Sequence, residues 1–286
     1  MVEFSKRISA LGLRLLPRKT LSRGLGSLTR MRRIEPGVSR AIELFAAAYQ
    51  VDMDEAVIPD GGFKTFNEFF TRELRPGARH IDPDPSVLIS PADGEVAEMG
   101  RVEADRTLTI KGKPYTVDEL LGGDPLSSRF ASGSHATIYL SPRDYHRVHA
   151  PVSGKVVSIE YLGGTLYPVN SIGTEYIPKL FAKNERVAVI QESETHGLVA
   201  TVLVGAIGVG RMSLSFDDLI TNSGAEKVRK DLRDASVYLE KGDELGRFNL
   251  GSTVILFVEG KIPLDFHAVL GEPIRMGERL ATRSGS

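Results

Sequence analysis

The first 80 residues show apolar positions at helical spacing. Residues 4–15 place apolar side chains on one face of a helix, with basic residues displaced from that face, until Pro17 breaks the pattern. A second helical pattern runs from Val38 to about Val57, and a third runs from Thr65 to Leu74, ahead of a Pro-Gly pair. The pattern therefore predicts a helical N-terminal region over residues 1–80.

Beyond residue 85 the pattern changes to short β-branched runs separated by glycine and proline. Residues 91–96 and 151–156 also share a P-x-x-G-x-V spacing, and each opens such a run. We therefore expect an α+β fold, in which residues 85–286 form one mainly antiparallel β barrel or sandwich. The predicted strands are Thr107–Ile110, Thr137–Leu140, Lys155–Ile159, Val187–Ile190, Leu198–Val204 and Ser252–Val258.

Composition narrows the class of protein. The chain has 286 residues, of which 41% are apolar and 26% charged, as in ordinary globular proteins. It has no cysteine, which excludes disulfide scaffolds, thiolate metal sites and cysteine nucleophiles. The apolar run 197–210 has 14 residues, fewer than the ~20 that a transmembrane helix needs.

Charge is distributed unevenly along the chain. Residues 1–33 carry nine basic side chains and one acidic one, whereas the remainder has a net charge of −9. Such a basic, leucine-bearing arm suits an anionic membrane surface, where each Lys or Arg contributes about 1 kcal/mol. The alternatives are an unstructured nucleic-acid arm and a solvated helix face. A cleaved signal peptide fits poorly because arginines interrupt every apolar stretch.

Among six histidines, only His146 and His149 lie close together in the sequence. With Asp93 they would supply three zinc ligands, but no further ligand lies at suitable spacing, so we expect no metal site. Asp93, ahead of a glycine, is by itself typical of a turn. The Gly251-Ser252 pair likewise reads as an ordinary turn, although it leads directly into a strand of buried type.

Several motifs in order nevertheless resemble the phosphatidylserine decarboxylase family, whose members depend on a pyruvoyl group. The Leu-Gly-Ser-Thr segment at 250–253 is similar to the cleavage motif of its bacterial and mitochondrial form. The matching segments are 66–72, 74–77, 90–94, 145–151, 163–170, 184–187 and 241–253.

The resemblance implies a proenzyme that cuts itself between Gly251 and Ser252. Ser252 would be the nucleophile, His149 would accept its proton, and Asp93 would orient the imidazole. The products would be a β chain, residues 1–251, and an α chain, residues 252–286, with a covalent pyruvoyl group derived from Ser252 at its N-terminus.

The resemblance also implies a reaction: phosphatidylserine is converted to phosphatidylethanolamine and CO2. The substrate amine would form a Schiff base with the pyruvoyl carbonyl, which then acts as an electron sink. His146 would protonate the resulting carbanion, with His149 as the alternative.

The implied partners are an anionic membrane surface, the substrate lipid and a second copy of the chain, in a homodimer, with no nucleic acid. We expect a peripheral position on the cytoplasmic face of a bacterial inner membrane. Arg72, Arg75 and the loop 163–170 are candidate phosphate or lipid contacts, although local packing explains them equally well.

Three other functions stay open at this point. A serine protease would cut external peptides repeatedly, whereas the Gly-Ser motif predicts one cut per chain. A sister decarboxylase would act on another headgroup or on a soluble amine precursor. A lipoyl-like β domain with a basic arm would serve as a membrane-bound interaction module and keep Ser252 intact.

Overall fold

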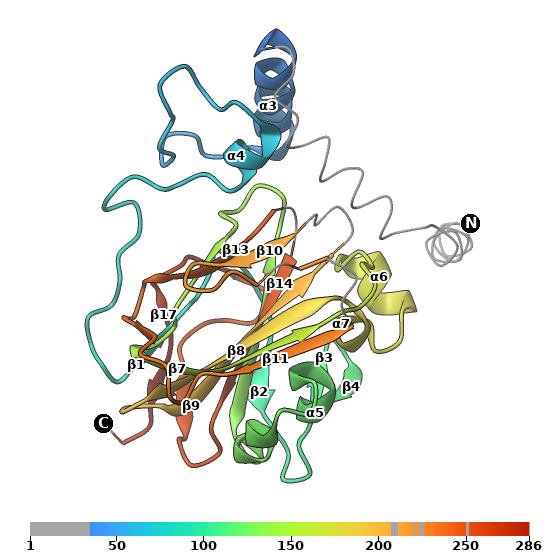
Figure 1. Cartoon of the computed structure of the whole chain (residues 1–286), viewed down its shortest axis with the longest axis vertical. Helices are drawn as coiled ribbons and strands as arrows, with labels where there is room; N and C mark the ends of the chain where they lie inside the picture. Colours follow the sequence, from blue (N-terminus) through green and yellow to red (C-terminus); the bar gives the residue numbers. More distant parts are fainter. Residues whose placement is uncertain (1–34, 207–210, 220, 223–225, 250–251, 286) are drawn as a thin grey trace.

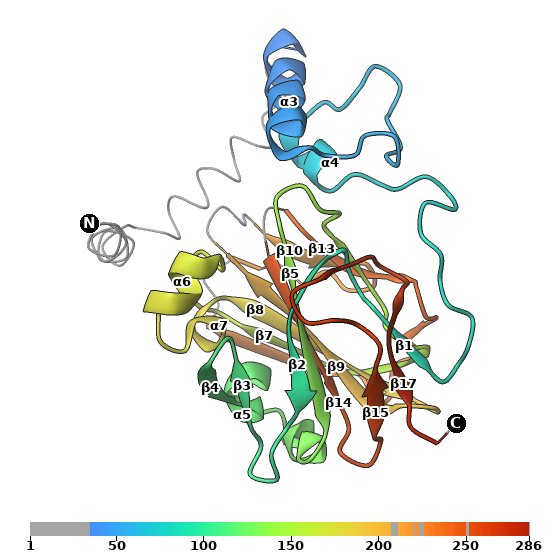
Figure 2. The same ribbon diagram turned by 180° about the vertical axis from the view of Figure 1, so that it is seen from behind.

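The computed structural model describes residues 35–206, 211–219, 221–222, 226–249 and 252–285. A small helical part stands at one end of a larger β body (Figures 1 and 2). The predicted membrane arm, residues 1–33, lies outside the described residues. The helices are α3 (Glu35–Tyr49), α4 (Phe66–Phe70), α5 (Val117–Leu121), α6 (Ser171–Tyr176) and α7 (Leu180–Lys183), with a 3-10 helix at Pro125–Phe130.

One nine-stranded sheet dominates the β body. Its strand order is β11-β7-β8-β9-β14-β5-β2-β16, with β12 also paired to β7. Every strand pair in the described part of the chain is antiparallel, which confirms the predicted mainly antiparallel fold. The strands are β2 (Gly94–Arg101), β5 (Ser134–Leu140), β7 (Gly154–Leu162), β8 (Arg186–Ser193), β9 (Gly197–Gly205), β11 (Lys227–Asp231), β12 (Tyr238–Leu239), β14 (Ser252–Val258) and β16 (Pro273–Ile274).

Three smaller sheets complete the described body. The path of the large sheet runs from β11 to β16 without joining its ends, so the described residues form no closed barrel. The small sheets pair β1 (Val87–Ile89), β17 (Arg279–Arg283) and β15 (Leu264–Phe266); β10 (Met212–Leu214), β13 (Glu244–Phe248) and β6 (Arg147–His149); and β3 (Thr107–Ile110) with β4 (Lys113–Thr116).

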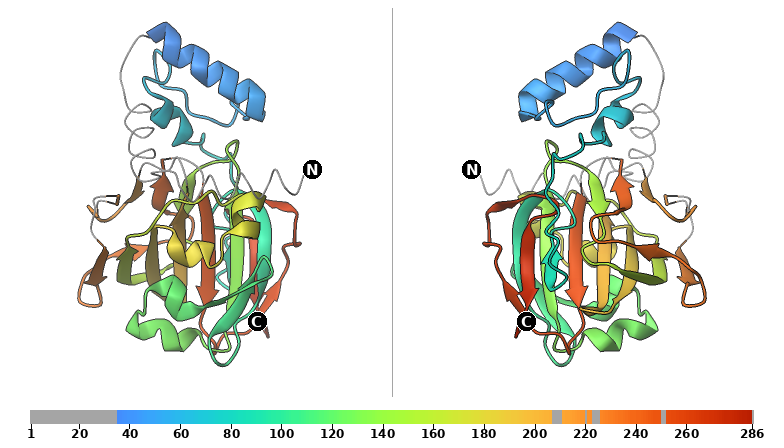
Figure 3. Two further views of the ribbon diagram at one scale, coloured as in Figure 1. Left: turned by 90° about the vertical axis from the view of Figure 1, so that its right-hand side faces the viewer. Right: turned by 90° about the vertical axis from the view of Figure 1, so that its left-hand side faces the viewer.

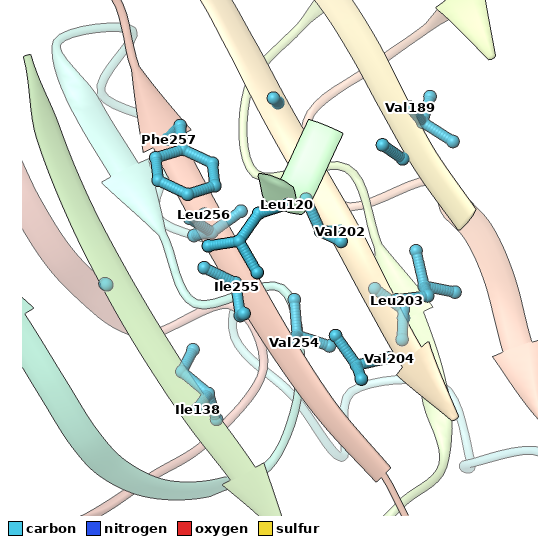
Figure 4. Packing of buried hydrophobic residues seen from close by; sticks show 14 of the residues in the cluster. Leu120, Ile138, Val189, Val202, Leu203, Val204, Val254, Ile255, Leu256 and Phe257 are labelled. Atoms are coloured by element: carbon cyan, nitrogen blue, oxygen red, sulfur yellow. The ribbon is translucent and has the colours of Figure 1, made fainter. Parts of the chain in front are cut away.

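Strand β14 lies at the centre of the core. It pairs with β5 on one side and β9 on the other, and each of its seven residues is buried. Figure 4 shows Val254 to Phe257 beside Ile138 of β5 and the valines of β9, with Leu120 of α5 in the same cluster. Because both faces of β14 are covered, residues 254–258 form a continuous apolar run, as expected for a strand of buried type.

The helical part differs from prediction in its boundaries. The predicted helix 38–57 begins three residues earlier and ends at Tyr49, where Gln50 takes a left-handed conformation with φ of 56°. The Val51 N–H then donates to the Ala46 carbonyl, which closes the helix as a Schellman motif. The predicted helix 65–74 is only α4, which Thr65 caps by accepting from the Glu68 N–H.

Ion pairs join the helical part to the β body. Glu55 accepts from Arg79 and from Arg275, both at 2.8 Å. Arg147 of β6 donates to the Thr71 carbonyl at 3.0 Å and also pairs with Glu244 of β13. The division into 1–80 and 85–286 stays a prediction, but these contacts fix the end of α4 beside β6 and β13.

The two P-x-x-G-x-V segments have the same structural role. Gly94 begins β2 and Gly154 begins β7, both in the large sheet. A Cβ at Gly154 would lie 2.7 Å from the Glu192 carbonyl oxygen, and one at Gly94 would collide with the Tyr139 carbonyl oxygen. Each glycine therefore allows a close approach of neighbouring strand backbones.

We predict that Gly94→Ala lowers the free energy of unfolding by about 1–3 kcal/mol, because the added methyl group forces β2 away from β5. Urea denaturation of the purified protein measures this change. Gly100→Ala is the matched control on the same strand, since its Cβ would lie 3.6 Å from the nearest atom, His135 Nε2. Equal losses in the two variants would contradict the close-approach argument.

Candidate active site

Ser252 is the first residue of β14, and its side chain is fully buried. It lies opposite Leu140 of β5 and Gly205 of β9. Its hydroxyl has no hydrogen-bond partner in the described structure, a state that costs free energy for a buried polar group. The preceding residue, Gly251, lies outside the described residues. The strand therefore holds a desolvated hydroxyl next to the predicted cleavage point.

His149 ends β6 and is held by two hydrogen bonds. Its Nδ1 lies 2.7 Å from the Gly242 carbonyl oxygen, and its Nε2 lies 3.0 Å from the Tyr145 hydroxyl. Because a carbonyl only accepts, Nδ1 carries the proton and Nε2 is left as the acceptor. Burial lowers the pKa of His149, against the raising effects of the Gly242 carbonyl and the Glu244 charge. The ring is thus a neutral base at Nε2.

Asp93 is held by Arg79, not by His149. Arg79 Nε donates to Oδ1 at 3.0 Å, Arg79 Nη2 donates to Oδ2, and the Met276 N–H donates to Oδ1 at 2.8 Å. The His149 N–H donates to the Pro91 carbonyl, two residues before Asp93, so the two segments are adjacent. In this conformation Asp93 and His149 therefore lie on adjacent segments, whereas within the described residues no hydrogen bond and neither of the two cavities described below joins Ser252 to them.

His146 is fully buried against Phe70 of α4, with ring centroids 4.1 Å apart. Its Nδ1 lies 2.8 Å from the Asp144 carbonyl, and its Nε2 has no partner in the described structure. Burial lowers the pKa of His146 to about 3, and the charge of Arg72 adds to this effect. Its own carbonyl accepts from the Phe248 N–H, which places it beside the chain that leads to Ser252.

Two cavities beside Asp93 and His149 share part of their lining, and neither Ser252 nor His146 lines either of them. One, the Asp93 cavity, measures about 310 Å³ and is lined by Asp93, Arg72, Glu55, Arg143, Asp144 and Arg275, among others. The other, the His149 cavity, measures about 300 Å³ and is lined by His149, Gly242, Glu244, Arg75, Arg147 and Met276, among others. Arg79 and Tyr145 line both cavities and form the wall between them.

Sequence reasoning missed Arg79, Tyr145 and Gly242. Tyr145 and Gly242 lie inside the motifs 145–151 and 241–253, so a closer reading of those motifs would have found them. Arg79 follows a Pro-Gly turn and carries no sequence signal that relates it to Asp93. Within the described residues, no three His, Asp or Glu side chains converge as metal ligands.

Comparison with known proteins identifies the family. The model of the phosphatidylserine decarboxylase family matches residues 66–282. A phosphatidylserine decarboxylase proenzyme of Anaeromyxobacter sp. (strain K) is 45% identical over 278 residues, covering 96% of this chain and 98% of the relative. Proenzymes of the same name from Pseudomonas fluorescens and Marinobacter nauticus are 44% and 41% identical, covering 96% and 92% of this chain and 97% and 93% of the relatives.

These matches extend over nearly the whole chain and confirm the resemblance that the motifs indicated. The relatives carry the name of a proenzyme and of a decarboxylase. The chain belongs to the phosphatidylserine decarboxylase family, a family of decarboxylating enzymes.

Proposed function

We propose that this chain cuts itself between Gly251 and Ser252 and then converts phosphatidylserine to phosphatidylethanolamine and CO2. The observation that carries the proposal is the buried, unpartnered hydroxyl of Ser252 at the start of a strand paired on both sides. The proenzyme name of the relatives supports a processing step at this place.

The cleavage chemistry uses the chain's own atoms. Ser252 Oγ attacks the Gly251 carbonyl carbon, the hydroxyl proton passes to the base, and the amide nitrogen leaves with a proton, so that an ester replaces the amide. Loss of the Ser252 Cα proton then breaks the Cβ–O bond and releases Gly251 as a carboxylate. The dehydroalanine that remains tautomerises and takes up water, which expels ammonia and leaves the pyruvoyl group.

His149 is the base in this scheme. The Gly242 carbonyl fixes the proton on Nδ1 and leaves the lone pair of Nε2 toward the Tyr145 hydroxyl. Asp93, held by Arg79, acts on His149 through its charge, which raises the pKa of that histidine and stabilises the imidazolium once it has taken the proton. Tight placement of nucleophile and carbonyl is worth about 7–11 kcal/mol, which explains why a single bond breaks.

The site fits a group formed from Ser252. A buried side-chain position with no hydrogen-bond partner, between β5 and β9, provides a dry place for a small carbonyl group. The pyruvoyl group supplies a carbonyl that captures the substrate amine and accepts the electron pair left when CO2 departs. His146 is the candidate proton donor to carbon; since burial keeps it neutral, it must first take up a proton at Nε2.

Three competing functions make different predictions. A serine protease turns over external peptides, and a lipoyl-like module keeps the chain whole and releases no ammonia. A sister decarboxylase cuts itself but leaves phosphatidylserine unchanged. Intact-mass measurement, an assay of CO2 release from phosphatidylserine and an assay of peptide hydrolysis therefore together separate all four.

We expect Ser252→Ala to leave one uncut chain of 286 residues, because the attacking hydroxyl is gone. Denaturing gels and intact mass show whether the fragments 1–251 and 252–286 are present. Thr253→Val is the matched control, since it removes the next buried and unpartnered hydroxyl of β14 without changing side-chain shape. Cleavage of Ser252→Ala at the normal position would refute this nucleophile.

We expect self-cleavage to depend on the neutral form of His149. Since burial lowers the pKa of His149 below its ordinary value of 6.5, the base form persists to lower pH. The cleavage rate of newly translated chain, followed on gels, should be constant from pH 8 down to about 6.5 and fall only below that.

His149→Ala should slow cleavage at least 100-fold, in line with the loss of a general base. Asp93→Asn should slow it less, because Asp93 acts through its charge. His267→Ala, which changes an exposed histidine, is the control. Normal cleavage in His149→Ala, or a pH midpoint above 6.5, would remove His149 from the base role.

A lipid substrate requires contact with a membrane surface. In the described part of the chain no helix is long and apolar enough to cross a membrane. Leu44 and Tyr49 of α3, and Val57 and Ile58 in the segment after it, are exposed apolar side chains. We infer a peripheral protein on the cytoplasmic membrane face, held by residues 1–33, and the family resemblance supports a homodimer.

Deletion of residues 1–33 should lower the fraction of protein that sediments with vesicles containing anionic phospholipid, because nine basic residues are lost. A full-length variant with these nine residues changed to Gln keeps the leucines and should bind as weakly at low salt. Binding of the full chain should fall with added salt, since screening weakens surface charge attraction. Undiminished sedimentation after deletion would place the membrane contact elsewhere.

A further inference from the structure

Arg72 is a buried cation without a carboxylate partner. It follows α4 and is 5% exposed. One atom, Nη2, donates to the Arg143 carbonyl at 3.2 Å, whereas Nε and Nη1 have no partner in the described structure. No carboxylate of the described residues forms an ion pair with Arg72, unlike Arg79, which pairs with both Asp93 and Glu55.

The unsatisfied nitrogens of Arg72 destabilise the folded protein. A guanidinium carries five N–H donors in a planar fork and stays charged, so leaving two nitrogens unsatisfied inside the protein costs free energy. Burial lowers the pKa of Arg72, and the charges of Asp93 and Asp144 only partly oppose this effect. The ring of Phe69, whose centroid lies 5.6 Å from the guanidinium carbon, helps to hold the side chain in place.

Arg72 also lines the Asp93 cavity, whose other arginines are occupied. Arg79 and Arg275 both pair with Glu55, and Arg143 lies beside Asp144. Arg72 is therefore the arginine of this cavity without a carboxylate partner, and because its unpartnered Nε and Nη1 are buried, a ligand engages them through a turn of the side chain into the cavity. The cavity volume of about 310 Å³ is enough for a small polar headgroup.

We propose that Arg72 binds the phosphodiester of the substrate headgroup and so selects a phosphate-bearing amino acid lipid. The proposal rests on the function proposed above and names a residue for substrate recognition there. The planar fork of Arg matches two phosphate oxygens at once, which a point charge does not.

The substrate carries a second anionic group, its carboxylate, which is the alternative partner for Arg72. A cation bound to that carboxylate would stabilise the ground state more than the transition state, in which the negative charge moves away from the departing CO2. Binding of this kind would slow the reaction. Phosphate, which keeps its charge throughout the reaction, is therefore the better partner for Arg72.

The position of Arg72 suits this role. Residue 70 contacts the ring of His146, and the Arg72 charge is one cause of the low pKa of that histidine. A phosphate at Arg72 would offset this charge and make His146 easier to protonate. Figure 3 shows the helical part, which includes α4, toward the same end of the β body as the start of β14.

The first test measures binding without catalysis, in the uncut Ser252→Ala chain. Soluble glycerophosphoserine should raise its thermal unfolding temperature, while free L-serine, which has the carboxylate and amine but no phosphate, should not. Arg72→Gln should raise at least tenfold the glycerophosphoserine concentration needed for the same rise in unfolding temperature. Arg72→Lys should need a smaller increase. Arg233→Gln, which changes an exposed arginine paired with Asp231, should behave as the parent chain.

The second test measures turnover with the full, self-cleaved chain in mixed micelles of phosphatidylserine. Arg72→Gln should still cut itself, with KM raised at least tenfold and kcat changed less than threefold. If Arg72→Gln does not fold, Arg72→Lys gives the answer through the same split between KM and kcat.

Unchanged KM in an active Arg72 variant, or an equal response of the parent chain to L-serine and glycerophosphoserine, would overturn the proposal. A parent chain that neither cuts itself nor releases CO2 would instead refute the proposed function. The binding result in the uncut chain would then still decide whether Arg72 binds phosphate.

Discussion

Hydrogen bonding of β14 to β5 and β9 along all of its length fixes where Ser252 can lie. A strand paired on both sides and buried on both faces cannot shift by one residue without turning every side chain to the opposite face of the sheet, where it meets different neighbours. The backbone on one side of the predicted cleavage point is therefore rigid. Strand pairing of this kind supplies the placement that an intramolecular attack needs, and it also explains why the hydroxyl is desolvated.

The carboxylates of the candidate site are paired with arginines and not with histidines. Arg79 occupies both oxygens of Asp93, and Arg147 connects Glu244 of β13 to the end of α4. These two arginines hold the helical part against the β body and fix the carboxylates of the site at the same time. The helical part is thus a structural element of the candidate site, and it follows the arm in the sequence.

Much of the β body could be predicted from the sequence. The six β-branched runs all form strands, because β-branched residues bounded by Gly and Pro suit a buried sheet whatever their partners are. Helix ends were less predictable, since Gln50 adopts a left-handed conformation through contacts of Val51 with α3 that no local pattern shows. The partner of Asp93 could not be predicted from the sequence either, because Arg79 reaches Asp93 through tertiary packing.

Asp93 and His149 lie on adjacent segments, yet the motifs alone do not show which groups they are hydrogen-bonded to. The Gly242 carbonyl sets the tautomer of His149, and a backbone carbonyl at this place is available from any residue type. Only the Cβ-free position of the glycine, with φ of 92°, restricts the choice of residue there. The sequence motifs indicate which residues are candidates, whereas the fold decides which groups each one is hydrogen-bonded to.

Burial disfavours the charged forms of the candidate site residues. It keeps His146 and His149 neutral and leaves Arg72 charged but poorly satisfied. The guanidinium of Arg72 therefore lacks a carboxylate partner among the described residues, and the imidazole of His146 is neutral. A ligand that brings a lasting negative charge corrects both at once, since it satisfies the guanidinium and raises the pKa of the neighbouring imidazole. Under the proposed function, the acid for the final proton transfer would then be formed by substrate binding, which would tie proton donation to occupancy of the proposed headgroup site.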